Sequence, residues 1–187
     1  MAISIVQRPP LKCSEIEIDA FERLVKEGGE VNPNGLRGRI RSAYSLVWLQ
    51  GTDGTLVGVG AIKQPNEHYR SLVFMKAGSG EDPSNYEAEL GWIFLRAEFR
   101  GQGLSSSLIK KLLSVARGKA IYATIRENNE AMVPFSRNLS SYKKAGLIPQ
   151  MKAITIWCCI SRWPHNRVEL TSGTLTRFPQ FTWALAS

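Results

Sequence analysis

The sequence contains few cysteines and histidines, the residues that most often build metal centres and nucleophilic triads. Its 187 residues include three cysteines and two histidines. Cys13, Cys158 and Cys159 show no CxxC spacing, and the last two are adjacent in an apolar run, where cysteine packs as a small hydrophobic residue. We therefore expect no bound metal. His68 and His165 also offer little material for a Ser-His-Asp triad.

Long hydrophobic runs are also missing. No stretch approaches the roughly 18 apolar residues that a membrane span needs. The first residues, MAISIVQRPPLK, lack the charged and apolar regions of a signal peptide. These features predict a cytoplasmic protein without a membrane partner.

The composition is that of a globular protein with a basic surface. Hydrophobic residues make up 43% of the chain, and the length favours a single domain over residues 1–187. Lys and Arg number 24 against 16 Asp and Glu, which gives a net charge of +8. This balance suits nucleic acid, a polyphosphate cofactor or an acidic substrate. The densest basic group is Arg37, Arg39 and Arg41, which we expect to form a solvated helix face.

Hydrophobic periodicity predicts an alternation of strands and helices. Ser14 and Glu17 form a capping-box pattern before a helix that Gly28 and Gly29 end. A weaker helix, two strands joined by an Asp-Gly turn, and an ambiguous segment at 64–85 follow. The remaining predicted elements are a strand at 86–95, helices at 104–116 and 129–144, and strands at 120–125, 154–160 and 181–186. This order predicts an α/β (α+β) fold with a mixed sheet around one βαβ crossover.

The join between the 86–95 strand and the next helix carries the clearest functional signal. It reads FRGQGLSSSLIKKLL from Phe99 to Leu113. The first amides of a helix have no partners within the helix, and the helix dipole adds about half a positive charge there. Gly101 and Gly103 remove side chains near this backbone, and Arg100 adds charge. The join therefore predicts a site for a phosphate or diphosphate.

The RGQGLS segment resembles the acyl-coenzyme A motif of the GNAT acetyltransferase superfamily, Arg/Gln-x-x-Gly-x-Gly/Ala. Arg100 and Gly103 match the motif, and Ser105 takes its last small position. Downstream, ATIRENNEAM and SYKKAGL resemble the family's strand-then-Asn and Tyr-x-x-x-Gly-Phe segments. The resemblance spans roughly Tyr86 to Leu147 and implies a mostly antiparallel central sheet flanked by helices, with acetyl-CoA bound at the crossover.

The resemblance also implies which residues bind the cofactor. Backbone groups of Phe94 and Leu95 would pair with the pantetheine arm. Asn129, or else Asn128, would contact the cofactor from the following helix. The pyrophosphate would be held by the loop that comprises Arg100, Gly101, Gln102, Gly103, Leu104, Ser105 and Ser106.

Acetyl transfer to an amine requires a neutral nucleophile and therefore a base. The family often uses a glutamate on this strand, which points to Glu89, with Glu87 in reserve. Two-residue alternation places both on the face of Ile93 and Leu95. Tyr142 would protonate the departing thiolate. The structural alternatives are an ion pair for Glu89 and an interior aromatic for Tyr142. The early helices wall the acceptor site in this family, so the resemblance implies that Arg37, Arg39 and Arg41, if they do not form a solvated face, face the acceptor entrance.

The sequence thus predicts an acetyl-CoA-dependent N-acetyltransferase that acts on an amine of a small molecule or a protein. Two other functions stay open: a non-catalytic acyl-CoA-binding module, and a basic protein associated with nucleic acid or the ribosome. Neither the acceptor nor the choice between monomer and homodimer follows from the sequence.

Overall fold

A seven-stranded sheet forms the centre of the computed structural model, which describes residues 2–29, 31–126, 142–145 and 154–159. The strand order is β1-β2-β3-β4-β5-β7-β6. The strands are β1 (Ile3–Arg8), β2 (Ser45–Gly51), β3 (Leu56–Lys63), β4 (Ala88–Leu95), β5 (Ile121–Arg126), β6 (Tyr142–Ala145) and β7 (Ile154–Cys159). The α-helices are α1 (Glu15–Glu27), α2 (Leu36–Arg41), α3 (Glu67–Lys76) and α4 (Leu104–Val115). Short 3₁₀ turns occupy Pro10–Lys12, Pro83–Asn85 and Ala97–Phe99.

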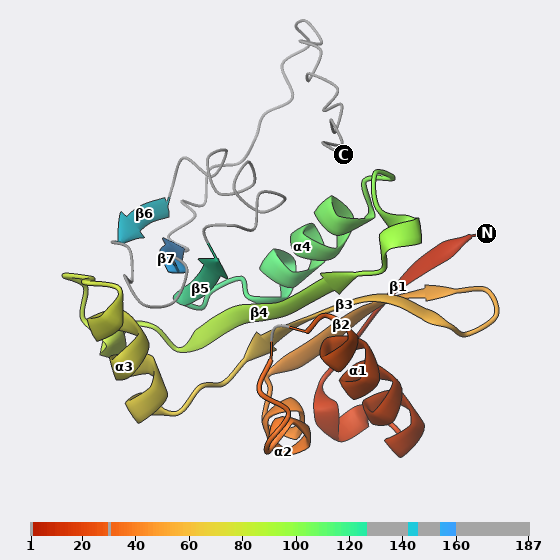
Figure 1. Ribbon diagram of the computed structural model, residues 1–187, viewed down its shortest axis with the longest axis horizontal. Helices are drawn as coiled ribbons and strands as arrows, with labels where there is room; N and C mark the ends of the chain where they lie inside the picture. Colours follow the sequence, from red (N-terminus) through yellow and green to blue (C-terminus); the bar gives the residue numbers. More distant parts are fainter. Residues whose placement is uncertain (1, 30, 127–141, 146–153, 160–187) are drawn as a thin grey trace, which may run out of the picture.

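The sheet is antiparallel except at one pair of strands. β4 and β5 run parallel, as strands joined by a crossover helix must, and α4 is that helix. In Figure 1, α4 lies on one side of the sheet, and α1 and α2 lie on the other. The predicted mixed sheet with one βαβ unit is therefore confirmed.

Helix α1 begins and packs as its sequence predicts. The Ser14 side chain accepts a hydrogen bond from the Glu17 amide, and the Glu17 side chain accepts one from the Ser14 amide. The apolar face of α1 is buried against α2 and the sheet. The buried cluster on this side comprises Ile18, Phe21, Leu24, Val25, Leu36, Ile40, Ala43, Leu46, Trp48, Val59 and Ala61. This packing fixes α1 and α2 over strands β2 and β3.

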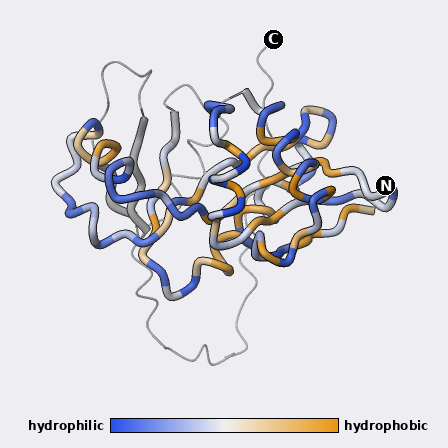
Figure 2. Tube along the Cα trace, turned by 90° about the horizontal axis from the view of Figure 1, so that it is seen from below, coloured by the Kyte–Doolittle hydropathy of each residue, from blue (hydrophilic) through white to orange (hydrophobic). Residues whose placement is uncertain are grey.

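Helix α4 covers the opposite face of the sheet. Leu108 and Leu112 are fully buried among residues from β2, β3, β4 and β5. Gly60 on β3 allows the close contact, since a Cβ there would lie 2.6 Å from Leu112 Cδ1. Figure 2 shows hydrophobic segments gathered in the central strands and adjoining helices. The N-terminus of α4 is thereby held beside the end of β4.

One predicted element is wrong within the described residues. The sequence predicted a helix over 129–144, whereas Tyr142–Ala145 forms strand β6, paired antiparallel with β7. Local apolar spacing cannot show that β7 offers a pairing partner to these four residues. The remainder of that predicted helix and the predicted strand at 181–186 lie outside the described residues. The ambiguous segment 64–85 contains α3, whose weak amphipathic pattern explains the ambiguity.

A bulge in β4 corrects the predicted side-chain faces. Gly91 pairs with Ala61 and Phe94 with Val59, so two residues of β4, Trp92 and Ile93, oppose Gly60 alone. Trp92 has a φ of 53°. The extra residue reverses the alternation beyond it, since Phe94 packs on the α1 side and Leu95 on the α4 side.

Glu89 lies before the bulge, between Ala88 and Leu90, which both pack on the α4 side. Its side chain therefore points to the α1 side. The sequence-based placement of Glu89 on one face with Ile93 and Leu95 is wrong, because simple alternation does not allow for the additional residue.

Candidate functional site

The loop before α4 presents a row of unpartnered backbone amides. Within the described part of the chain, no hydrogen bond to the N–H groups of residues 101–106 is found. Gly101 and Gly103 have φ values of 75° and 74°, in the region that glycine adopts without strain. The first turn of α4 contains no acidic residue. These six amides and the helix dipole favour an anion at this position.

Strands β4 and β5 separate before β4 reaches this loop. Their parallel pairing covers Ala88 to Leu90 of β4 and ends at the pair Leu90↔Ala123. Beyond this pair β4 continues to pair with β3, and β5 continues to pair with β7. No strand in the described ranges pairs with the β5-facing edge of residues 91–95. That edge therefore offers free main-chain groups to an extended ligand.

The register decides which residues present those groups. The Arg96 amide donates to the Val57 carbonyl, so Arg96 and Val57 form a hydrogen-bonded pair of the β3–β4 ladder. Hydrogen-bonded pairs occur at every second residue of an antiparallel ladder, and Phe94 and Val59 are the next such pair. The main-chain groups of Phe94 are therefore directed at β3. The groups of Leu95 are directed at the open edge, where its carbonyl accepts a hydrogen bond of 3.1 Å from Arg100 Nε. Leu95 therefore presents main-chain groups at the open edge and Phe94 does not, and the pairing of either residue with a pantetheine arm stays a prediction.

Glu89, the predicted base, lies where the two strands separate. Its side chain is 1% exposed. Thr124, one residue past the last β4–β5 pair, donates from Oγ1 to Glu89 Oε1 at 3.2 Å. The other oxygen, Oε2, lies 2.6 Å from Lys63 Nζ. This contact is an ion pair, and its angles are not those of a hydrogen bond. Both carboxylate oxygens of Glu89 therefore have a neighbour from a different strand.

Two aromatic rings flank the ammonium group of Lys63. Its Nζ lies 5.3 Å from the centre of the Trp92 ring and 5.7 Å from that of the Tyr69 ring. Such rings attract an ammonium group through their negative faces. Gly91 leaves room for Lys63, since a Cβ there would lie 2.9 Å from Lys63 Cδ. Carboxylate, rings and glycine together hold the amine at the bulge.

Tyr122 completes the buried part of the site. It is fully buried beside Glu89 in the β4–β5 register, and its hydroxyl has no hydrogen-bond partner among the described residues. Burial, and after it the charge of Glu89, raises the pKa of the Tyr122 phenol. The same two causes raise the pKa of Tyr69. Both phenols therefore keep their protons at neutral pH.

The other predicted site residues lie away from this point. Glu87 is exposed, precedes the strand separation and pairs with Lys119 Nζ at 2.9 Å. Tyr142 on β6 lies in register with Cys159 on β7, Ile121 on β5 and Ala88 on β4. Three strand spacings, about 14 Å, therefore separate Tyr142 from β4. The acid role of Tyr142 stays a prediction, which this spacing does not favour. Asn128 and Asn129 lie outside the described residues.

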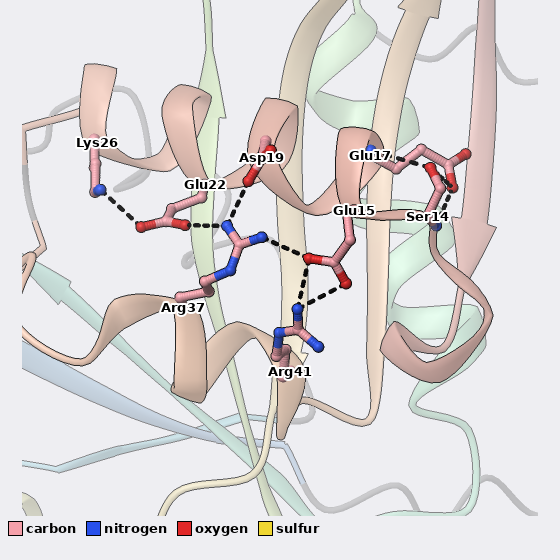
Figure 3. A network of polar contacts seen from close by, with 8 residues as sticks. All are labelled: Ser14, Glu15, Glu17, Asp19, Glu22, Lys26, Arg37 and Arg41. Atoms are coloured by element: carbon pink, nitrogen blue, oxygen red, sulfur yellow. Dashed lines mark hydrogen bonds and ion pairs between the residues drawn. The ribbon is translucent and has the colours of Figure 1, made fainter.

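The arginine group of α2 has a structural role (Figure 3). Arg37 donates to Asp19, Glu22 and Glu15 of α1, and Arg41 also donates to Glu15. Arg39 donates to the carbonyls of Asn32 and Asn34 instead. The bonds of Arg37 to the three carboxylates, and most of all the bond to Asp19, raise the pKa of Arg37. The bonds of Arg37 and Arg41 connect α2 to α1, which removes much of the support for a nucleic-acid surface.

Sequence reasoning missed Lys63, Thr124, Trp92 and Tyr122. Their meeting depends on the β3–β4–β5 register, which local patterns do not contain. One signal was available: Lys63 ends an otherwise apolar strand, and Gly91 interrupts another. Among the described residues, no group of three His, Cys, Asp or Glu side chains is arranged to hold a metal, and no helix could cross a membrane.

Comparison with known proteins agrees with this architecture. The model of the GNAT acetyltransferase family matches residues 13–139, and the chain belongs to that family. Its members use acetyl-CoA and amine acceptors. Among curated protein sequences, none matches this chain.

Several solved structures share the fold. Escherichia coli ElaA is 12% identical, with 84% of this chain and 99% of that chain covered and a TM-score of 0.61. An acyl-CoA N-acyltransferase from Pseudomonas aeruginosa is 14% identical, with coverages of 84% and 98% and a TM-score of 0.59. Arabidopsis thaliana Naa50, in complex with the bisubstrate analogue CoA-Ac-MVNAL, is 13% identical, with coverages of 84% and 98% and a TM-score of 0.57.

Proposed function

We propose that this protein is an acetyl-CoA-dependent N-acetyltransferase that transfers an acetyl group to a primary amine. One observation carries the proposal: the free edge of β4 begins at Gly91, two residues after Glu89, and ends beside the six unpartnered amides before α4. A ligand with an anionic end and an amide-containing arm fits this arrangement. The bisubstrate analogue bound by Naa50 contains CoA, which is consistent with such a ligand.

The pyrophosphate of the cofactor would be bound by the loop of residues 101–106. Backbone N–H groups hold a diphosphate without the entropic cost of ordering long side chains. Arg100 is exposed and flanks the loop, and it would exchange its contact with the Leu95 carbonyl for the phosphate charge. That exchange would also release the carbonyl for an amide of the pantetheine arm.

The reacting thioester would lie beside the bulge at Gly91–Ile93. From Leu95, an arm that follows β4 reaches Gly91 after about 13 Å at the usual rise per residue. The positive φ of Trp92 is uncommon for a bulky residue, and such backbone conformations concentrate at functional sites. We assign the base to Glu89 rather than Glu87, because only Glu89 lies at this point of the sheet.

The test is coenzyme A release over a panel of primary amines, measured with a thiol reagent. Glu89→Gln should lower kcat by about 10²-fold or more, the contribution of a positioned base, while acetyl-CoA affinity stays close to that of the wild type. Glu87→Gln is the matched control and should leave kcat unchanged. Equal turnover in wild type and Glu89→Gln would remove Glu89 from the reaction.

A non-catalytic acyl-CoA-binding module is the second candidate, and one observation favours it. Both oxygens of Glu89 are occupied, by Thr124 and by Lys63. A base held this way accepts a proton from an external amine only after Lys63 moves. Binding of acetyl-CoA by calorimetry, together with no thiol release over the panel, would favour this second function.

A further inference from the structure

We propose that Lys63 is itself an acceptor in this site, so that the chain transfers an acetyl group from bound acetyl-CoA to its own Lys63 Nζ. The inference rests on the proposed function, because it requires acetyl-CoA at the free edge of β4. Lys63 would then be a modification site within the chain, and its acetylation would remove the ionic partner of Glu89.

The position of the amine carries the argument. Lys63 Nζ lies 2.6 Å from Glu89 Oε2. A Cβ at Gly91 would lie 3.4 Å from the same Lys63 Nζ. Gly91 is the first residue of β4 beyond the last pair with β5. A ligand that pairs with the edge of β4 lies about 4.8 Å from that strand. A small rotation of the flexible lysine chain therefore covers the distance to a thioester at this edge.

The surroundings of Lys63 distinguish it from an ordinary surface lysine. The side chains of Lys63 and Glu89 are 15% and 1% exposed, and two aromatic rings restrict the amine. Lys119 provides a matched comparison within the same sheet. It also has a glutamate partner, Glu87, and an aromatic ring, Tyr44, but the two side chains of that ion pair are 34% and 50% exposed. The Lys119–Glu87 pair precedes the strand separation, away from the edge of residues 91–95.

The reaction balances with the groups present and acetyl-CoA. Lys63 gives one proton to Glu89, and the neutral Nζ attacks the thioester carbonyl carbon. The N–C bond forms and the C–S bond breaks, which leaves an amide on Lys63. Coenzyme A departs as the thiolate and takes up a proton from the protonated amide nitrogen or from water, and Glu89 later loses its proton to water. No oxidant, reductant or metal is needed.

The modification would change the state of the site. Acetyl-lysine has no charge, so Oε2 of Glu89 loses its ionic partner. Glu89 then becomes available to an external amine. Acetylation of Lys63 would therefore convert a self-occupied site into one that accepts other amines.

The experiment incubates the purified full chain with acetyl-CoA and follows acetylation by peptide mass spectrometry. We expect Lys63 to be acetylated at least about tenfold faster than Lys119, because a held amine reacts at a high effective concentration. The rate constant should stay the same on dilution of the protein, as an intramolecular transfer requires. Acetyl phosphate, which lacks the CoA part, should give no preference for Lys63.

Variants and binding measurements separate this inference from the proposed function. Lys63→Arg keeps the positive charge and should bind acetyl-CoA normally while the label at position 63 disappears; Lys119→Arg should leave the labelling of Lys63 unchanged. If the chain binds acetyl-CoA and acetylates an added amine, but Lys63 reacts no faster than Lys119, the inference is overturned and the proposed function stands. If acetyl-CoA does not bind, both are overturned.

Discussion

At the scale of single residues, the contact between Glu89 and Lys63 is the main charge pair of the site. A buried carboxylate is costly to ionise unless a cation or hydrogen-bond donors compensate it. Lys63 and Thr124 provide both kinds of compensation to Glu89. The sequence located Glu89 through family resemblance, whereas the lysine that pairs with it lies 26 positions earlier in the chain, on another strand.

Lys63→Met should destabilise the protein. Removal of one partner from a buried ion pair costs about 3–5 kcal/mol, and the slight exposure of Lys63 places the expected loss at the lower end of this range. Thermal or urea unfolding measures the change. Addition of Glu89→Gln to Lys63→Met should restore part of the loss, because the unpaired charge is removed.

Lys119→Met is the matched control for this stability effect. The Lys119–Glu87 pair is exposed, and exposed pairs contribute little to stability. Equal losses in Lys63→Met and Lys119→Met would contradict the view that the Lys63–Glu89 pair is a buried, interdependent unit.

At the scale of elements, the connection from β4 to α4 determines the site. The strand, the glycine turn and the helix were all predicted from the sequence, because apolar periodicity and glycine spacing are local signals. The bulge at Trp92 was not predicted, since it depends on how β4 pairs with Gly60 of β3. The bulge places Leu95 on the α4 side although Glu89, six residues earlier, is on the α1 side, so a one-residue irregularity decides which groups meet.

Gly103→Ala tests the turn at the start of α4. Gly103 has a φ of 74°, and a Cβ there would meet nothing within 4 Å, so the cost is conformational rather than steric. We expect a loss of about 1–2 kcal/mol in unfolding free energy together with weaker acetyl-CoA binding. Gly103→Asn, a residue that tolerates this conformation better, should lose less of both. Equal effects of the two substitutions would show that backbone conformation at position 103 is not the cause.

Arg37→Gln tests the connection between α1 and α2. Hydrogen bonds from Arg37 and then Arg41 lower the pKa of Glu15 from its ordinary value of 4.5. A carboxylate with a lowered pKa in the folded state contributes stability above pH 4.5, and this contribution is lost as the pH falls through the lowered value. The difference in melting temperature between wild type and Arg37→Gln should therefore be present at pH 7 and shrink in strong acid.

Arg23→Gln is the control for this prediction, because Arg23 is exposed on α1, the helix that carries Glu15, and makes no ion pair with a described residue. It removes the same charge and should change the melting temperature little at any pH. A difference between wild type and Arg37→Gln that stayed constant down to strong acid would contradict an electrostatic origin.

At the scale of the whole molecule, sequence reasoning obtained the architecture and the family but not the details of the site. Local patterns predicted α1, α4 and strands β2 to β5, and one motif identified the GNAT family. The assignment of Tyr142 to a helix failed, because pairing with β7 decides the structure of residues 142–145. The meeting of Lys63, Glu89 and Thr124 is likewise a property of three strands in register, which is not encoded in any short segment.

The central claim is that the amides before α4 and the free edge of β4 bind acetyl-CoA. Amide hydrogen exchange of the full chain, with and without coenzyme A, tests it most directly. The account predicts that coenzyme A slows exchange at residues 101–106 and at Leu95, whereas the amide of Phe94, already directed at β3, changes little. Unchanged exchange at residues 101–106 under saturating coenzyme A, or protection confined to another part of the molecule, would contradict the account.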